Sequence, residues 1–182
     1  MKNELIELLD NETTPQDVLI YNLFEKRKFL DIIKYFVIFE VVEGKTIKKL
    51  PRYQQLRAVN KIVDRLKNKN QGGVVWHTQG SGKSITMVYL ATKLRATTSG
   101  FDNPTILVLT DRTDLDNQIS STFRRTGFSN PIQASSISHL KTLLKDEFTS
   151  KPLKVLCVKF PNVLVVPAIV LLLLVFKIIH IP

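Results

Sequence analysis

The chain has 182 residues, which is enough for one domain with a modest hydrophobic core and leaves little room for a second. Its formal net charge of +10 favours an anionic partner such as nucleic acid, and a lysine-rich surface on a soluble protein explains the charge equally well. A single cysteine, Cys157, excludes an internal disulfide framework, and the three histidines are too scattered to indicate a metal site. The acidic start of the chain is unlike a signal peptide, so a cytoplasmic protein is expected.

Residues 1–50 are expected to form a helical lead-in segment. Thr14 is predicted to begin a helix, because Asp17 stands at the position that completes a capping box. The apolar run at residues 36–39 predicts a strand, and Gly44 marks a turn after it.

Residues 51–150 carry a pattern typical of a parallel sheet flanked by helices. Apolar residues recur at helical spacing from Arg52 to Leu66, and a short buried strand is predicted at residues 74–76. A glycine-containing loop and a helix follow, and then a second strand at residues 105–110 and a helix from Thr113. The predicted class is therefore α/β.

The loop between the first strand and its helix has the composition of a phosphate-binding P-loop. Gly80 and Gly82 let successive backbone amides point inward, and the following helix N-terminus adds to the anion site. Lys83 would place a positive charge on the phosphate oxygens and is the candidate catalytic residue, while Ser84 offers a hydroxyl to Mg²⁺. The full pattern has glycine at the first position, where this chain has His77. The predicted nucleotide-binding residues of the loop are His77, Thr78, Gln79, Gly80, Ser81, Gly82, Lys83 and Ser84.

Residues 151–182 differ from the rest of the chain. Residues 163–176 are uncharged, yet they fall short of the length of about 20 residues that a bilayer-crossing helix needs, and Pro167 interrupts them. A membrane segment, a buried pair of strands and a shift of reading frame near residue 155 each account for this atypical hydrophobic tail.

Four segments in order, FLDIIKYFVIFE, RYQQLRAV, WHTQGSGKS and LTDRTDLDNQI, resemble one family over about residues 20–145. The family is the motor (R) subunit of type I restriction endonucleases, a superfamily 2 helicase-like DNA translocase. The resemblance implies a partial RecA-like P-loop NTPase lobe, with ATP and Mg²⁺ as cofactors. It also implies double-stranded DNA as a partner, together with the specificity and methyltransferase subunits of a restriction complex; a membrane partner is not expected.

The resemblance also implies roles for residues outside the loop. Gln55, with Arg52 nearby, matches the glutamine that recognises adenine in such motors, although a polar helix start on the surface explains it as well. Thr110, Asp111 and Arg112 match a motif near the DNA path, where Thr110 and Arg112 would reach phosphates. The same motif is also consistent with a strand end followed by a helix cap at Thr113.

The sequence departs from the family where a complete motor needs more. No Asp-Glu pair of the Walker B type follows a third strand, and neither the second motor lobe nor the nuclease domain is recognisable. Residues 154–160 (KVLCVKF) keep only the outline of the next family strand. The expectation is a fragment of a restriction motor subunit that binds ATP. Another P-loop ATPase or kinase, a non-enzymatic DNA-binding remnant and a membrane-anchored peptide are the alternatives.

Overall fold

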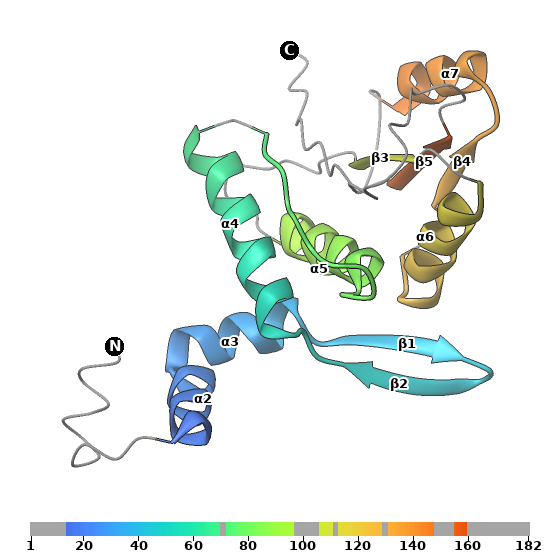
Figure 1. The fold of residues 1–182 in the computed structure, drawn as a ribbon. Coiled ribbons are helices and arrows are strands. Elements are labelled where there is room, and N and C mark those ends of the chain that lie inside the picture. The colour runs from blue at the N-terminus through green and yellow to red at the C-terminus, as the bar shows by residue number, and fades with distance from the viewer. Residues whose placement is uncertain are drawn as a thin grey trace.

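The structure is a computed structural model, and it describes residues 14–69, 72–96, 106–110, 113–128, 131–147 and 155–159. These residues form two short helices, a β-hairpin and a mixed α/β unit (Figure 1). The first 13 residues of the expected helical lead-in and the part of the hydrophobic tail from residue 160 onward lie outside the described residues.

Two short helices, α2 (Pro15–Phe24) and α3 (Lys26–Tyr35), open the described part of the chain. The predicted capping box is confirmed: the Asp17 backbone N–H donates to the Thr14 hydroxyl at 3.3 Å, and the Thr14 N–H donates to the Asp17 carboxylate at 2.9 Å. The hydroxyl and then the backbone N–H of Thr14 hold the pKa of the Asp17 carboxyl below its ordinary value, because both donate to its charged form.

A two-stranded antiparallel hairpin follows, made of β1 (Ile38–Val42) and β2 (Lys45–Lys49). Glu43 and Gly44 form its turn with φ of 50° and 75°, and two successive positive φ values match the twist of a two-residue hairpin. The predicted turn at Gly44 is therefore confirmed. The hairpin also means that residues 1–50 are not helical throughout.

The strand predicted at residues 36–39 begins two residues later than expected. Phe36 ends α3 instead: its backbone N–H donates to the Ile32 carbonyl at 2.9 Å, and its ring is fully buried. The second strand of the hairpin was not predicted, because its sequence, KTIKK, is mostly charged and exposed and lacks an apolar alternation.

The helical core is built around two long helices, α4 (Tyr53–Lys69) and α5 (Lys83–Ala96), both at predicted positions. The predicted apolar face of α4 is buried at Val59, Ile62, Val63 and Leu66. Helix α5 is buried on nearly every side, as expected for a helix packed between others. Its buried residues are Thr86, Met87, Val88, Tyr89, Leu90, Ala91 and Leu94.

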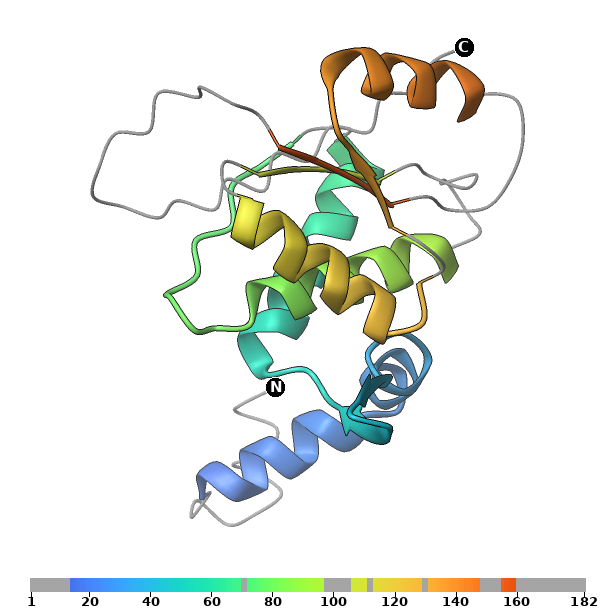
Figure 2. The ribbon, with the colours of Figure 1, turned by 90° about the vertical axis from the view of Figure 1, so that its right-hand side faces the viewer.

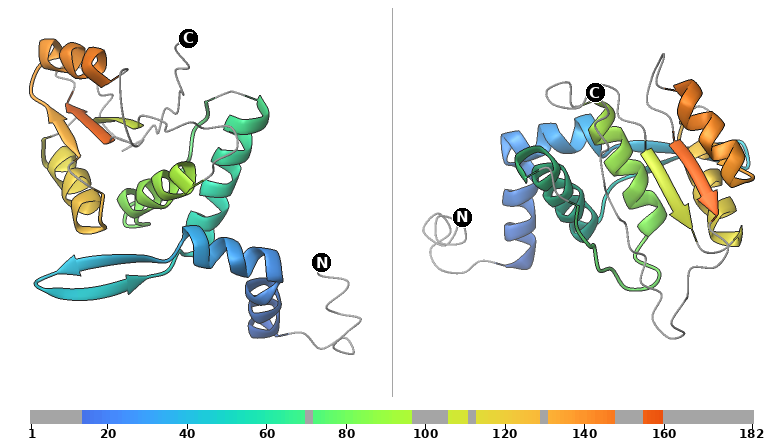
Figure 3. Two further views of the ribbon diagram at one scale, coloured as in Figure 1. Left: turned by 180° about the vertical axis from the view of Figure 1, so that it is seen from behind. Right: turned by 90° about the horizontal axis from the view of Figure 1, so that it is seen from above.

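The α/β unit contains three parallel strands in the order β3-β5-β4. Figure 2 shows α5 and α6 on one side of this sheet and α7 on the other, and Figure 3 shows β3 and β5 side by side. The α/β character is thus confirmed, and residues 154–160 do contain a strand. The elements are β3 (Ile106–Thr110), α6 (Thr113–Arg125), β4 (Ile132–Ala134), α7 (Ile137–Glu147) and β5 (Val155–Lys159).

The prediction of a buried strand at residues 74–76 is wrong. The segment is irregular, and the side chains of Val74 and Trp76 are 60% and 65% exposed. No backbone hydrogen bond joins it to another described part of the chain. Three apolar residues become a strand only beside a paired neighbour, and the structure describes none next to them.

An ionic cluster inside the helical core joins three helices. The Lys93 ammonium of α5 donates to both carboxylate oxygens of Asp31 at 2.6 and 2.7 Å and to the Asn60 side chain at 2.7 Å. It also lies 5.1 and 5.2 Å from the ring centres of Tyr35 and Phe36. Because the ammonium is largely buried, these contacts replace water that it has lost.

Replacing Lys93 by methionine is expected to lower the free energy of unfolding by about 1–3 kcal/mol, because Asp31 loses the cation that compensates its partial burial. Urea unfolding followed by circular dichroism measures this change. Lys67→Met, at an exposed position of α4, is the matched control and should change the free energy by less than about 0.5 kcal/mol. Equal effects of the two substitutions would contradict the role assigned to the cluster.

Candidate phosphate-binding site

The predicted phosphate-binding loop runs directly into the N-terminus of α5. Gly80 and Gly82 adopt the left-handed conformation, with φ of 74° and 78°. A Cβ atom on Gly82 would lie 2.7 Å from the Gln55 Nε2 atom, so the position excludes a side chain on two independent grounds. The glycines therefore have the conformational role that the sequence predicted for them.

The loop is closed by its own lysine. The Lys83 Nζ atom donates to the Thr78 carbonyl oxygen at 2.8 Å, and the Ser81 backbone N–H points at the same oxygen from 3.4 Å. The Gly82 carbonyl accepts from both the backbone N–H and the hydroxyl of Thr86, each at 3.0 Å. The ammonium thus lies across the turn, bound to a neutral oxygen that an anion would replace.

Gln55 holds the loop against α4. Its side-chain carbonyl accepts the Arg52 backbone N–H at 2.9 Å, and its amide nitrogen donates to the carbonyls of Ser81 and Gly82 at 3.2 and 3.1 Å. The side chain is only 3% exposed, so the alternative of a polar surface position does not apply in this structure. Since both donor hydrogens of the amide are used, Gln55 is a structural clamp on the loop.

A small cavity of about 210 Å³ lies beside the loop. It separates the end of the hairpin from the glycine turn, and Tyr89 of α5 forms part of its wall. Burial raises the pKa of the Tyr89 phenol to about 12. The lining residues are Lys49, Leu50, Arg52, Gln55, Gly80, Ser81, Gly82, Ile85 and Tyr89.

The five remaining residues of the predicted loop lie in different surroundings: Ser81, Ser84, Thr78, Gln79 and His77. The buried Ser81 hydroxyl has no hydrogen-bond partner among the described residues, and Ser84 is half-buried in the first turn of α5. Thr78 and Gln79 are exposed at the tip of the loop. His77, half-buried, lies at the other end of the loop and lines a separate groove along α4.

Of the three predicted DNA-proximal residues, Thr110 is the one that the structure describes. Thr110 is buried at the end of β3, and its hydroxyl donates to the Asp116 carboxylate at 3.4 Å. Gln133 of β4 donates to the other oxygen of Asp116 at 2.8 Å, so this carboxylate joins β3, α6 and β4. Asp111 and Arg112 lie outside the described residues.

Sequence reasoning missed the two residues with the clearest structural roles near the site. Asp116 lies one helical turn inside α6, where an acidic residue reads as part of an ordinary solvated face. Tyr89 stands in an apolar helical run, in which an aromatic residue signals core packing alone. Neither position carries a local pattern that distinguishes it.

Two features are absent from the described residues. No group of three or more His, Cys, Asp and Glu side chains gathers there as a metal-binding cluster. None of the described helices is both long enough and apolar enough to cross a bilayer.

The chain matches the SWI2/SNF2 ATPase family over residues 54–165, which is more than half of its length. This chain therefore belongs to the SWI2/SNF2 ATPase family, and membership implies a RecA-like α/β fold. The match contains the predicted phosphate-binding loop, Gln55 and the Thr110–Asp116 contact.

Three curated relatives of this chain are all named endonuclease subunits of type I restriction enzymes. The chain is 48% identical over 112 residues to the type I restriction enzyme HindI endonuclease subunit of Haemophilus influenzae, which covers 58% of this chain and 10% of that protein. It is 34% and 32% identical to the putative MjaIXP and MjaVIIIP endonuclease subunits of Methanocaldococcus jannaschii, over 79% and 75% of this chain and 14% of each of those proteins. No solved structure matches the chain significantly.

These relatives confirm the resemblance to the type I restriction motor subunit. The chain spans between 10% and 14% of the length of these curated relatives.

Replacing Gln55 by glutamate is expected to lower the free energy of unfolding by about 2–3 kcal/mol, because a carboxylate has no hydrogen to donate to the Ser81 and Gly82 carbonyls. Gln54→Glu is the matched control, because Gln54 is the neighbouring residue on the same helix and its side chain is exposed. Urea midpoints measured for both variants decide the matter, and similar losses would show that Gln55 does not clamp the loop.

The buried phenol of Tyr89 predicts a stability change at high pH. Its pKa of about 12 in the folded chain exceeds the ordinary value of 10.0, so the unfolded chain loses this proton first. The contribution is fully present below pH 10 and is lost as the pH rises from 10 toward 12.

Tyr89→Phe should therefore lose less stability than the original chain across that interval, while Tyr53→Phe, with an exposed ring, should behave like the original. The three proteins share all their other ionisable side chains, so the comparison of their urea midpoints isolates Tyr89. Parallel curves for the original chain and Tyr89→Phe would contradict the assignment.

Proposed function

We propose that this chain binds ATP with Mg²⁺ through the loop at residues 77–84, as part of the DNA-translocating motor of a type I restriction system. One observation carries the proposal: two left-handed glycines, Gly80 and Gly82, lead into α5 with Lys83 folded across the turn. This arrangement provides backbone N–H groups, a helix N-terminus and an ammonium group at one place.

The residues present fit the phosphate part of a nucleotide. The absence of a side chain on Gly82 keeps the turn accessible to an anion. Within the described part of the chain, the Lys83 ammonium is held by a neutral carbonyl that a phosphate oxygen would outcompete. On binding, Lys83 would leave Thr78 and neutralise the phosphates. The buried hydroxyl of Ser81, which pairs with no other described residue, is a further donor within the same turn.

The fit to the metal is less complete. Ser84 would contribute a hydroxyl ligand from the first turn of α5, and the described residues supply no cluster of carboxylates to complete the coordination. Mg²⁺ would reduce the charge repulsion among the phosphates when bound. We therefore expect ATP binding with poor hydrolysis by this chain.

The adenine would lie on the side of the loop that faces Arg52. The small cavity bounded by Arg52, Gln55 and Tyr89 adjoins the glycine turn there. Because the Gln55 amide already uses both of its hydrogens, it would contact adenine only by releasing one loop carbonyl. Gln55 would therefore mainly position the loop, and it would contact adenine as an additional role.

The restriction assignment is supported by relatives that are named endonuclease subunits of type I restriction enzymes. Double-stranded DNA, near Thr110, Asp111 and Arg112, and the specificity and methyltransferase subunits are the partners that we propose for the whole protein. Since the Thr110 hydroxyl is bound to Asp116, its contact with DNA would run through the backbone or through neighbouring residues.

Lys83→Ala tests the nucleotide site. The substitution should weaken binding of a fluorescent ATP analogue by at least about tenfold, because it removes the charge that compensates the phosphates. Lys67→Ala, with an exposed side chain on α4, should bind like the original chain. Equilibrium titrations with and without Mg²⁺ provide the measurement, and undiminished binding by Lys83→Ala would refute the proposed site.

A further inference from the structure

A groove of about 700 Å³ runs along α4, away from the glycine turn. Helix α4 forms one wall, and the irregular segment of residues 73–77 forms the other. The backbone of that segment forms no sheet, so its outer side remains open to ligands. Nothing in the ATP site requires a groove at this position.

A row of cations lines the helical wall. Arg57, Lys61, Arg65 and Lys69 follow one another every four residues, and all four side chains are exposed. Four residues of helix advance by about 6 Å, a step comparable with the spacing of successive phosphates along an extended strand. One acidic residue lines the groove, Asp64, and its carboxylate accepts a hydrogen bond from Asn68 at 2.6 Å.

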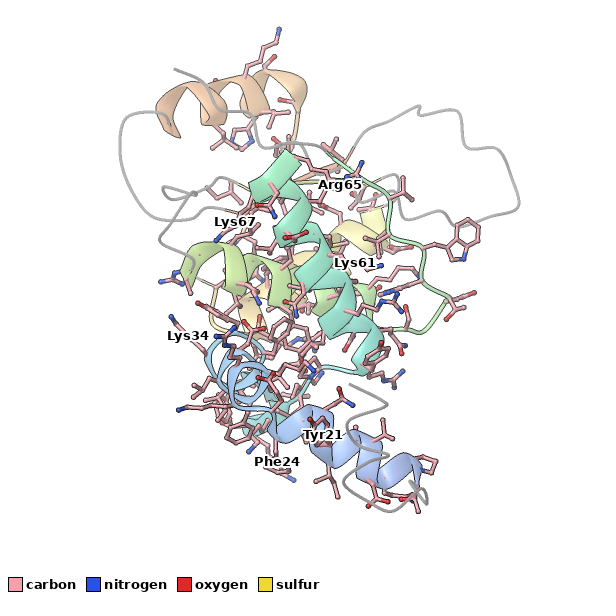
Figure 4. All side chains as sticks on the ribbon, turned by 90° about the vertical axis from the view of Figure 1, so that its left-hand side faces the viewer. Tyr21, Phe24, Lys34, Lys61, Arg65 and Lys67 are labelled. Atoms are coloured by element: carbon pink, nitrogen blue, oxygen red, sulfur yellow. The ribbon has the colours of Figure 1, made fainter. Side chains whose placement is uncertain are left out.

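The row faces the irregular segment. Figure 4 shows Lys61 and Arg65 on the side of α4 that faces this segment and Lys67 on the opposite side of the helix. The Arg65 Nε atom donates to the Gly72 carbonyl at 2.7 Å, which ties the end of the helix to the start of the segment. The charge is thus concentrated within the groove, while Lys67 is not among its lining residues.

Two aromatic rings accompany the cations. Trp76 is 65% exposed and Tyr53 is 73% exposed, and both line the groove. An exposed indole in a basic groove is the arrangement on which unpaired bases stack, with affinity that tolerates many sequences. A duplex cannot use such a ring without unstacking a base pair, and an acidic peptide gains little from it.

We propose that this groove binds a single-stranded stretch of nucleic acid. The phosphates lie along the row from Arg57 to Lys69, and a base stacks on Trp76. The site shares only His77 with the phosphate-binding loop, so it does not depend on ATP binding.

Trp76 is the single tryptophan of the chain, so its fluorescence reports directly on the groove. Titration of the full chain with a thymidine oligonucleotide of about 15 nucleotides should quench that fluorescence. Four phosphate contacts predict a slope of about −3 in a plot of the logarithm of affinity against that of salt concentration. Binding without quenching would overturn the proposal.

Charge-reversing substitutions distinguish binding in the groove from binding caused by the overall positive charge of the chain. Lys61→Glu and Arg57→Glu should each weaken binding of a labelled oligonucleotide by roughly tenfold at low salt and flatten the salt slope. Lys67→Glu makes the same charge change on the same helix and should weaken binding far less. Equal losses of affinity for Lys61→Glu and Lys67→Glu would refute the proposal that phosphates lie along this row.

Substitutions of Trp76 test whether a base stacks on its ring. Trp76→Ala should weaken binding by about five-fold to a hundred-fold, and Trp76→Phe should retain most of it, as measured by anisotropy of the labelled strand. Lys83→Ala should leave this binding intact, which distinguishes a failure of the ATP site from a failure of the groove. Binding of polyglutamate or of a duplex as strong as that of the single strand would contradict the proposal.

Discussion

The burial of α5 fixes the position of the predicted phosphate-binding loop at its N-terminus. Helix α5 packs against α3, α4 and α6, and residues such as Val88 and Ala91 on it are fully enclosed. A helix surrounded in this way cannot rotate or slide without exposing apolar surface, at a cost of about 25 cal/mol for each Å². The loop attached to its N-terminus is therefore held in place, and Gln55 reaches it from the adjoining helix.

Two ionic contacts attach the N-terminal elements to this core. Lys93 connects α5 to α3 and α4 through Asp31 and Asn60. Glu40 of the hairpin is buried and pairs with Lys49 and with Arg125 of α6, whose Nε atom is 3.3 Å from the carboxylate. Each contact joins segments far apart in the chain, so the helical lead-in, the hairpin and the α/β unit support one another.

The helices could be predicted from the sequence because their signals are local. The capping box at Thr14 and the apolar period of α4 depend on residues a few positions apart. The segment at residues 74–76 could not be assigned in the same way, because a strand exists only through a partner elsewhere in the chain. The charged strand β2 was missed for the opposite reason: its backbone pairs although its side chains give no apolar pattern.

The same contrast holds for the candidate site. Gly80, Gly82 and Lys83 could be predicted as loop residues from their residue types alone. The left-handed conformations of the two glycines are consistent with that prediction. The clamp formed by Gln55 could not be foreseen, since its partners are backbone carbonyls 26 and 27 residues away. Likewise, the Asp116 contact with Thr110 exists only once β3 and α6 are folded together.

Residues 74–76, which pair with no strand in the described part of the chain, favour association between copies of the chain in solution. Val74, Val75 and Trp76 have high β-propensity and carry no charge, and the side chains of Val74 and Trp76 are exposed while that of Val75 is half-buried. Such a stretch can add its backbone groups to the open edge of another molecule's sheet, as edge strands do in aggregating proteins. Self-association of the chain should therefore begin at this stretch and increase with protein concentration.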